Sequence, residues 1–148
     1  WFKSFNVYAS WKNWGAWTLD YRPDFTAKET GLDTFIDWDK DFVGKNFAKK
    51  DESKNKLTPL IVETNDIDVT NNEAVLKNGK AIGYVTSGGF AHFTNKSVAF
   101  SYLDSKEISS EKGIQVEING DLFNSSVIKS PLYDPTGQKM RSWWHKKT

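Results

Sequence analysis

This chain contains no recognisable sequence motif for acid–base or nucleophilic chemistry. Its two imidazoles, His92 and His145, lie in no nucleophile-elbow motif, and no His-Glu-x-x-His or similar ligand cluster occurs. A hydrolytic triad needs a nucleophile, a base and an orienting group that converge in space. The absence of cysteine removes thiolate nucleophiles, disulfides and Cys-ligated metal sites. We therefore predict no catalytic residue and no metal site in this chain.

Two glycine-containing pairs indicate backbone geometry rather than chemistry. Gly88-Gly89 lacks the spacing of a dinucleotide fingerprint and precedes no expected helix, so we interpret it as a sharp strand bend. Asn78-Gly79 lies between the apolar runs 74–76 and 81–85, and Asn-Gly can adopt the two positive φ values of a type I′ turn. This pair predicts a β-hairpin, and the run 98–103 predicts a third adjoining strand.

Short β-patterned runs follow one another from Leu57 onward. Residues 114–118 alternate apolar and polar side chains, which indicates one buried and one wet face, and Asn119-Gly120 offers a second tight turn. Six such strands predict a mainly β fold, an antiparallel barrel or sandwich, and closure into a barrel would remove the exposed edges. The predicted strands lie at residues 60–62, 74–76, 81–85, 98–103 and 114–118, and the last β-patterned residues are 122–123 and 127–128.

The first part of the chain has a mixed pattern. Residues 5–9 alternate as a short strand would. Thr26 and Glu29 have the spacing of a capping box, and Gly31 is placed to end the helical turn that follows. These signals predict a short α+β segment.

The next residues lead to a domain boundary. Residues 34–38 could form a strand, and Asp41 can cap a short helix over 42–50. Charged side chains then dominate residues 49–56, which is typical of a solvated connection. We place the boundary after residue 50, which gives two parts, 1–50 and 51–148.

Aromatic residues are abundant, with seven Trp, five Tyr and ten Phe in 148 residues. Trp11, Trp14 and Trp17 surround Gly15, and packing against a neighbouring domain is the favoured explanation, with ligand stacking as the alternative. The tail 143–148 could be a packed strand, a partner-binding tail or disordered. The chain starts without Met inside an apolar-alternating segment, so we expect a piece of something longer.

Charge and composition narrow the class of partner. The net charge is +1, with 20 basic against 19 acidic side chains, so no large electrostatic surface for nucleic acid or anionic membrane is expected. No apolar run approaches the roughly 20 residues that span a bilayer, and no signal peptide opens the chain. We expect a globular cytoplasmic protein with no nucleic-acid or membrane partner.

Several motifs occur in a fixed order along the chain. They are Asn78-Gly79-Lys-x-x-Gly83-x-Val85-Thr86-Ser87-Gly88-Gly89-Phe90, Lys96-Ser97-Val98-Ala99, Asp41-Phe42-Val43-Gly44-Lys45, Pro131-Leu132-Tyr133-Asp134-Pro135, Trp14-Gly15 and Asp20-Tyr-Arg-Pro-Asp-Phe-Thr26-Ala-Lys-Glu29-Thr-Gly31-Leu32. Together they resemble the glycine-cleavage T-protein (aminomethyltransferase) family, from about Phe5 to Arg141. The segment from Trp14 to Leu32 is most similar to the branch fused to dimethylglycine and sarcosine dehydrogenases.

The resemblance implies a fold and a division of labour. Residues 51–148 would be the six-stranded antiparallel barrel that ends T-proteins, and 1–50 the end of the folate-binding domain. The family passes a one-carbon unit from an amine to tetrahydrofolate, and its catalytic Asp would lie before this chain. FAD would belong to a fused or partner domain. The partner would be the neighbouring N-terminal T-protein-like domain or another copy of the chain.

The resemblance also gives three candidate folate-binding residues. Tyr8 falls where the family has a pterin-binding Glu, and a Tyr hydroxyl does not offer the paired acceptors of a carboxylate. Trp14 could stack on a pterin, and Arg141 could pair with the glutamyl tail. A non-catalytic β-barrel interaction module that has lost folate affinity is the alternative. A maintenance protein for iron–sulfur or tRNA-modifying enzymes is disfavoured because that branch carries a Cys motif.

Overall fold

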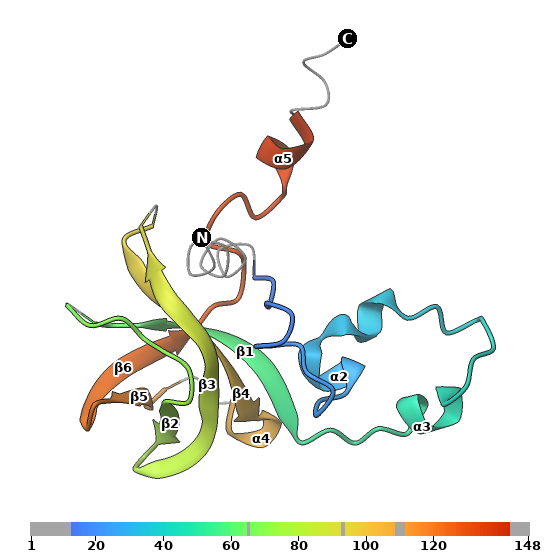
Figure 1. Ribbon diagram of the computed structural model, residues 1–148, viewed down its shortest axis with the longest axis horizontal. Helices are drawn as coiled ribbons and strands as arrows, with labels where there is room; N and C mark the ends of the chain where they lie inside the picture. Colours follow the sequence, from blue (N-terminus) through green and yellow to red (C-terminus); the bar gives the residue numbers. More distant parts are fainter. Residues whose placement is uncertain (1–12, 65, 93, 109–111, 143–148) are drawn as a thin grey trace.

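The computed structural model of the chain describes residues 13–64, 66–92, 94–108 and 112–142. Six antiparallel strands close into a barrel in the order β1-β4-β3-β2-β5-β6, and β6 pairs with β1 to complete the circle (Figure 1). This confirms the predicted six-stranded antiparallel barrel. The strands are β1 (Asn55–Val62), β2 (Ala74–Lys77), β3 (Lys80–Ala91), β4 (Lys96–Asp104), β5 (Ile114–Ile118) and β6 (Asp121–Val127).

Both predicted Asn-Gly turns are present. Asn78 and Gly79 have φ values of 52° and 77°, and Asn119 and Gly120 have 53° and 90°, as tight hairpins require. Gly88-Gly89 does not end the strand: β3 continues through the pair, and both glycines stay in register with β4, opposite Ala99 and Val98.

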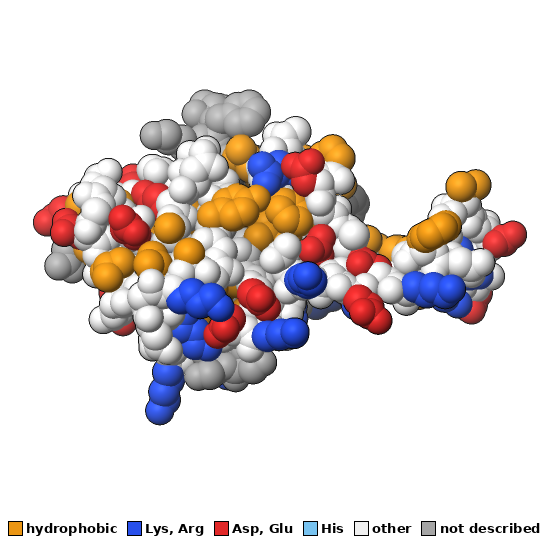
Figure 2. Space-filling model, turned by 90° about the horizontal axis from the view of Figure 1, so that it is seen from below, with side chains coloured by type: hydrophobic (Ala, Val, Ile, Leu, Met, Phe, Trp, Pro, Cys, Tyr) orange, Lys and Arg blue, Asp and Glu red, His pale blue; other side chains and the backbone are white. Residues whose placement is uncertain are grey.

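Short helices precede and follow the barrel strands in sequence, and one lies between β4 and β5. None of the helices in the described residues has the length and apolar character needed to cross a membrane. We call residues 31–54, which connect the first short helix to the barrel and project from it, the arm (Figures 1 and 2). The helices are α2 (Ala27–Thr30), η1 (Leu32–Phe35), α3 (Lys45–Lys49), α4 (Ser105–Ile108) and α5 (Gln138–Ser142).

Local signals near α2 are confirmed, and two expectations in the arm are wrong. The Thr26–Glu29 capping box forms, and Gly31 ends the helix with φ 74°. Residues 34–38 are not a strand, since η1 occupies the first two and no strand of the described chain pairs with the others. The second helix covers Lys45–Lys49 only, because Gly44, with φ 88°, precedes it in place of an Asp41 cap. The predicted strand at 5–9 lies outside the described residues.

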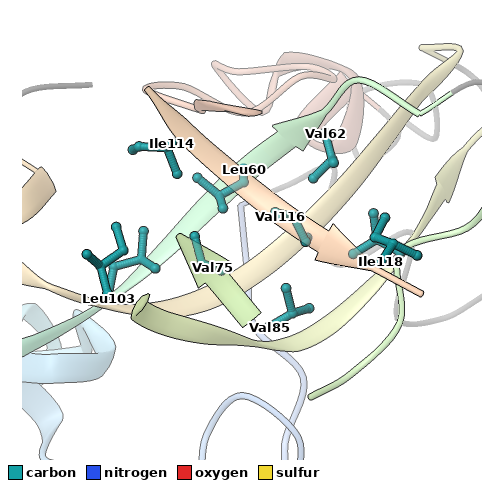
Figure 3. Packing of buried hydrophobic residues seen from close by; sticks show 11 residues of the cluster. Leu60, Val62, Val75, Val85, Leu103, Ile114, Val116 and Ile118 are labelled. Atoms are coloured by element: carbon teal, nitrogen blue, oxygen red, sulfur yellow. The ribbon is translucent and has the colours of Figure 1, made fainter. Parts of the chain in front are cut away.

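The barrel interior is filled by one set of alternating side chains. Along β5, Ile114, Val116 and Ile118 point inward while the residues between them face outward (Figure 3). Val69, in the loop before β2, also enters this core, and its carbonyl approaches Gly88 so closely that a Cβ there would lie 2.7 Å away. The interior also contains Leu60, Val62, Val75, Ile82, Val85, Ala99 and Leu103.

The outer wall is covered in two places by chain that does not belong to the barrel. Phe100 and Tyr102 of β4 and Leu57 of β1 pack against Tyr21 from the preceding segment. Val98, on the same strand, packs instead against the segment that follows β6. The barrel therefore carries the N-terminal segment on one part of its surface and the C-terminal segment on another.

Gly83 gives a direct test of this packing. A Cβ at this position would lie 1.9 Å from the carbonyl oxygen of Tyr102, so Gly83→Ala has to push β3 away from β4. We expect a loss of about 3 kcal/mol or more in unfolding free energy by urea denaturation. Gly120→Ala is the control, since its Cβ meets open space and only the positive φ costs about 1–2 kcal/mol. Equal losses would contradict this account of the packing.

Candidate functional site

A buried carboxylate fixes the N-terminal segment to the barrel. Asp20 is only 1% exposed, and its carboxylate accepts the Ser87 hydroxyl at 2.8 and 2.9 Å and the Ala16 amide at 2.7 Å. The Thr86 hydroxyl donates to the same carboxylate. A buried polar group is costly unless it is hydrogen-bonded, and these donors meet that requirement. We call Asp20, Ala16, Thr86 and Ser87 the Asp20 cluster.

A β-bulge explains how two adjacent hydroxyls reach one carboxylate. Neighbouring side chains on a regular strand point to opposite faces. In β3 the register with β4 shifts between Val85 and Ser87, since Val85 pairs with Ser101 and Ser87 with Phe100. The extra residue, Thr86, lets both hydroxyls face the loop that carries Asp20. The bulge therefore builds the receptor for the carboxylate.

Two tyrosines complete the attachment. The Tyr102 hydroxyl donates to the Asp20 carbonyl oxygen at 2.7 Å, and the Tyr21 hydroxyl accepts the Gly15 amide at 2.9 Å. Gly15 allows this approach, since a Cβ there would lie 2.9 Å from both Asp20 and Tyr21. Burial raises the pKa of both tyrosines above the ordinary value of 10.0, and the neighbouring Asp20 carboxylate adds to the rise.

The attached loop presents an aromatic surface. Trp14, 41% exposed, meets Tyr21 edge-on with ring centroids 5.8 Å apart and Phe35 at 5.7 Å. Trp17 contacts the other side of Tyr21 at 5.3 Å and is largely exposed. We call Trp14, Trp17 and Phe35 the aromatic patch. Exposed rings on a fixed support can stack on a flat ligand or anchor a partner.

A cation lies on the same segment. The Arg22 guanidinium donates to the Tyr84 hydroxyl at 2.5 Å and lies 5.3 Å from the Phe25 ring centroid. Phe25 in turn stacks on Tyr102, with centroids 3.4 Å apart and planes 12° from parallel. Arg22 is therefore held by aromatic contacts and a hydrogen bond.

The predicted folate-binding residues have different outcomes. Tyr8 lies outside the described residues, as does the tail 143–148. Trp14 is on the aromatic patch, and its ring is partly exposed. Arg141 is exposed on α5, where its guanidinium donates to the Thr136 carbonyl oxygen. Within the described residues, no group of three or more His, Asp or Glu side chains is arranged to hold a metal ion.

Sequence reasoning missed the Asp20 cluster. Asp20 was visible only as part of a family motif, and its hydroxyl partners are 66 and 67 residues away. The one local signal was the adjacent pair Thr86-Ser87 in an otherwise apolar strand. Two neighbouring hydroxyls followed by glycines indicate a bulge with polar side chains on one face. If those hydroxyls are buried, they need a hydrogen-bond partner from elsewhere in the chain.

The fold and its attached loop have known relatives. Glycine cleavage system aminomethyltransferase T from Bartonella henselae has a similar crystal structure, with TM-score 0.78 and 21% identity over 88% of this chain and 38% of that one. The fold is therefore that of an aminomethyltransferase T. The glycine cleavage T-protein C-terminal barrel domain matches residues 55–134, more than half of the chain. This chain belongs to the glycine cleavage T-protein C-terminal barrel family.

Two curated relatives show how the match is distributed. Human mitochondrial dimethylglycine dehydrogenase is 31% identical over 137 residues, which cover 88% of this chain and 16% of the dehydrogenase. The aminomethyltransferase of Thermotoga petrophila is 37% identical over 110 residues, which cover 71% of this chain and 29% of that enzyme. The chain thus spans less than a third of either relative.

The Asp20 cluster predicts a large difference between two aspartates. Asp20→Ala removes the shared acceptor and leaves the Thr86 and Ser87 hydroxyls buried without it, so we expect a loss of about 3 kcal/mol in unfolding free energy. Asp24→Ala, at an exposed position four residues later, should change it by about 0.5 kcal/mol at most. Urea denaturation measures both, and comparable losses would contradict the proposed role of Asp20.

The buried tyrosines predict a loss of stability in alkali. Below pH 10 both are neutral in the folded and the unfolded chain, so their effect is constant. Above pH 10 each tyrosine ionises more readily in the unfolded chain than in the folded one, so stability should fall, with a limiting slope of about 1.4 kcal/mol per pH unit for a tyrosine that stays neutral when folded. Denaturant titrations from pH 8 to about 11 measure the slope, which Tyr102→Phe should reduce. An unchanged slope in that variant would contradict the assignment.

Proposed function

We propose that this chain is the C-terminal, site-closing portion of a tetrahydrofolate-dependent aminomethyltransferase-like protein. The observation that carries the proposal is the match to human dimethylglycine dehydrogenase, which extends over 88% of the chain. Residues 55–148 are less than two thirds of the chain, so this match includes part of the segment that bears the aromatic patch. In this proposal the reactive carboxylate lies in another part of the protein, and a flavin belongs to a fused or partner domain.

The geometry favours a role in positioning the folate rather than in the chemical step. Tetrahydrofolate would act as the acceptor of a one-carbon unit from a methylated amine or a glycine-derived aminomethyl group. Trp14 offers a partly exposed ring on which a pterin can stack. The Asp20 cluster keeps that ring at a constant position relative to the barrel. The chain would orient the pterin and exclude water from one side of the site.

A β-barrel interaction module without folate affinity is the second candidate. Trp17 and Phe35 favour it, because both rings are largely exposed and suit a protein interface. Tyr8 at the position of the family's Glu also favours it. The two candidates differ in whether pterin binding depends on Trp14.

The test uses the chain alone and a chimaera. The chimaera joins the part of the Thermotoga petrophila enzyme that precedes the matched region to this chain. We expect no transfer of a one-carbon unit to tetrahydrofolate by the chain alone, and folate binding by the chimaera. Trp14→Ala in the chimaera should weaken folate binding about tenfold, since one stacking contact contributes roughly 1–3 kcal/mol. Trp17→Ala is the matched control and should change the affinity less than about twofold.

Three results would count against this proposal. Catalytic transfer by the isolated chain would show that it is not merely site-closing. A folded chimaera that binds no tetrahydrofolate at millimolar concentration would favour the interaction module. Equal effects of the two Trp variants would exclude Trp14 as the stacking residue.

A further inference from the structure

The arm contains large apolar side chains that nothing in the described chain covers. Phe47 on α3 is 86% exposed, and Val43 is fully exposed. Figure 2 shows hydrophobic side chains on the part of the molecule that projects from the barrel. Each such side chain would gain about 1.5–3 kcal/mol on burial, so the arm has the composition of a buried surface.

The arm lacks the interactions that would stabilise it alone. The helix α3 has five residues, none of them buried, and no side-chain cap at its start. Isolated helices of that length are unstable in water without a packed face. The arm is held to the rest of the described chain at its two ends. At one end Leu32 packs against the cluster that contains Tyr21, and Phe35 contacts Trp14. At the other end Ser53 bonds Thr26 at 3.1 Å, and the Lys28 ammonium donates to the Asp51 carbonyl at 2.6 Å. The remainder of the arm therefore needs a partner surface.

A hollow beside α3 is lined by the kinds of residue found in protein–protein interfaces. Its volume is about 540 Å³, and it lies between α2, the residues after η1, and α3. Its lining includes the apolar residues Ile36, Trp38 and Phe47 and the charged residues Lys28, Lys49 and Asp51. Protein–protein contacts typically combine aromatic and apolar side chains with polar ones. The hollow can accept an apolar side chain of a partner while the exposed rings of the arm pack around it.

The relatives indicate what the partner is. The matched region is 16% of the dehydrogenase and 29% of the Thermotoga enzyme, and the matched barrel is by description C-terminal. Most of each relative therefore precedes the match, in the same polypeptide as the counterpart of the arm. We propose that the arm docks, through Val43, Phe47 and the hollow, on the polypeptide that in the relatives precedes this region. This choice of partner rests on the proposed function.

Cysteine labelling can test the docking, because the chain contains no cysteine. Val43→Cys is placed in the chain alone and in the Thermotoga chimaera, and the rate of maleimide labelling at this position is followed by mass spectrometry. We expect the rate to fall at least about tenfold in the chimaera, since a covered thiol reacts only when the interface opens. Leu122→Cys, at an exposed position on β6, is the matched control and should label equally in both proteins.

A second substitution tests the apolar character of the contact. Phe47→Asp, combined with Val43→Cys in the chimaera, should restore rapid labelling because a carboxylate is costly to bury in an apolar contact. Leu122→Asp, combined in the same way, should leave the protection unchanged. Equal effects of the two variants would overturn the role of Phe47.

Four outcomes would overturn the docking proposal or separate it from the proposed function. Rapid labelling in both proteins would overturn it. Protection in the chain alone that rises with concentration would identify a second copy as the partner instead. A chimaera that does not fold, where the intact Thermotoga enzyme does, would also overturn it. Protection of Val43→Cys without folate binding would support the docking and contradict the folate-dependent function.

Discussion

The burial of the Asp20 carboxylate is the constraint that fixes the N-terminal segment on the outer wall of the barrel. A carboxylate taken out of water needs donors of defined position, and Ser87, Thr86 and the Ala16 amide supply them. Two of these donors belong to the barrel and one to the loop itself. The loop therefore cannot move along the barrel without leaving a buried polar group unsatisfied, and Trp14 has a fixed position as a consequence.

Strand β3 contributes side chains to the core of the barrel and to the attachment on its outer wall. Val85 of β3 fills the core, and the bulge immediately after it turns Thr86 and Ser87 toward Asp20. Gly88 then allows the Val69 carbonyl to approach from the loop before β2. A change in the register of β3 would disturb the core and the outer attachment together, so the position of the aromatic patch is coupled to the packing of the barrel.

Features set by neighbouring residues were predictable from the sequence, and features set by distant ones were not. The Asn78-Gly79 turn, the Thr26 capping box and the alternation in β5 depend on adjacent side chains and were predicted correctly. The strand expected at 81–85 extends to Ala91, through Gly88-Gly89, because pairing with β4 continues along these residues. The Asp20 cluster joins residues more than 60 positions apart, which no local pattern records. Trp14 was predicted from its family motif, and its binding role stays a prediction.

The barrel and the arm differ in where their stability comes from. The barrel has a closed sheet and a continuous core, so its strands satisfy one another's hydrogen bonds. In the arm, Phe47 and Val43 lie in solvent and no residue of α3 is buried, so little burial offsets the entropy lost when this segment is ordered. Burial of two or three such side chains contributes several kcal/mol, by rough transfer values, enough to order a short segment. A partner would therefore be recognised mainly by the arm. The Asp20 cluster would hold the aromatic patch in a fixed position relative to the barrel.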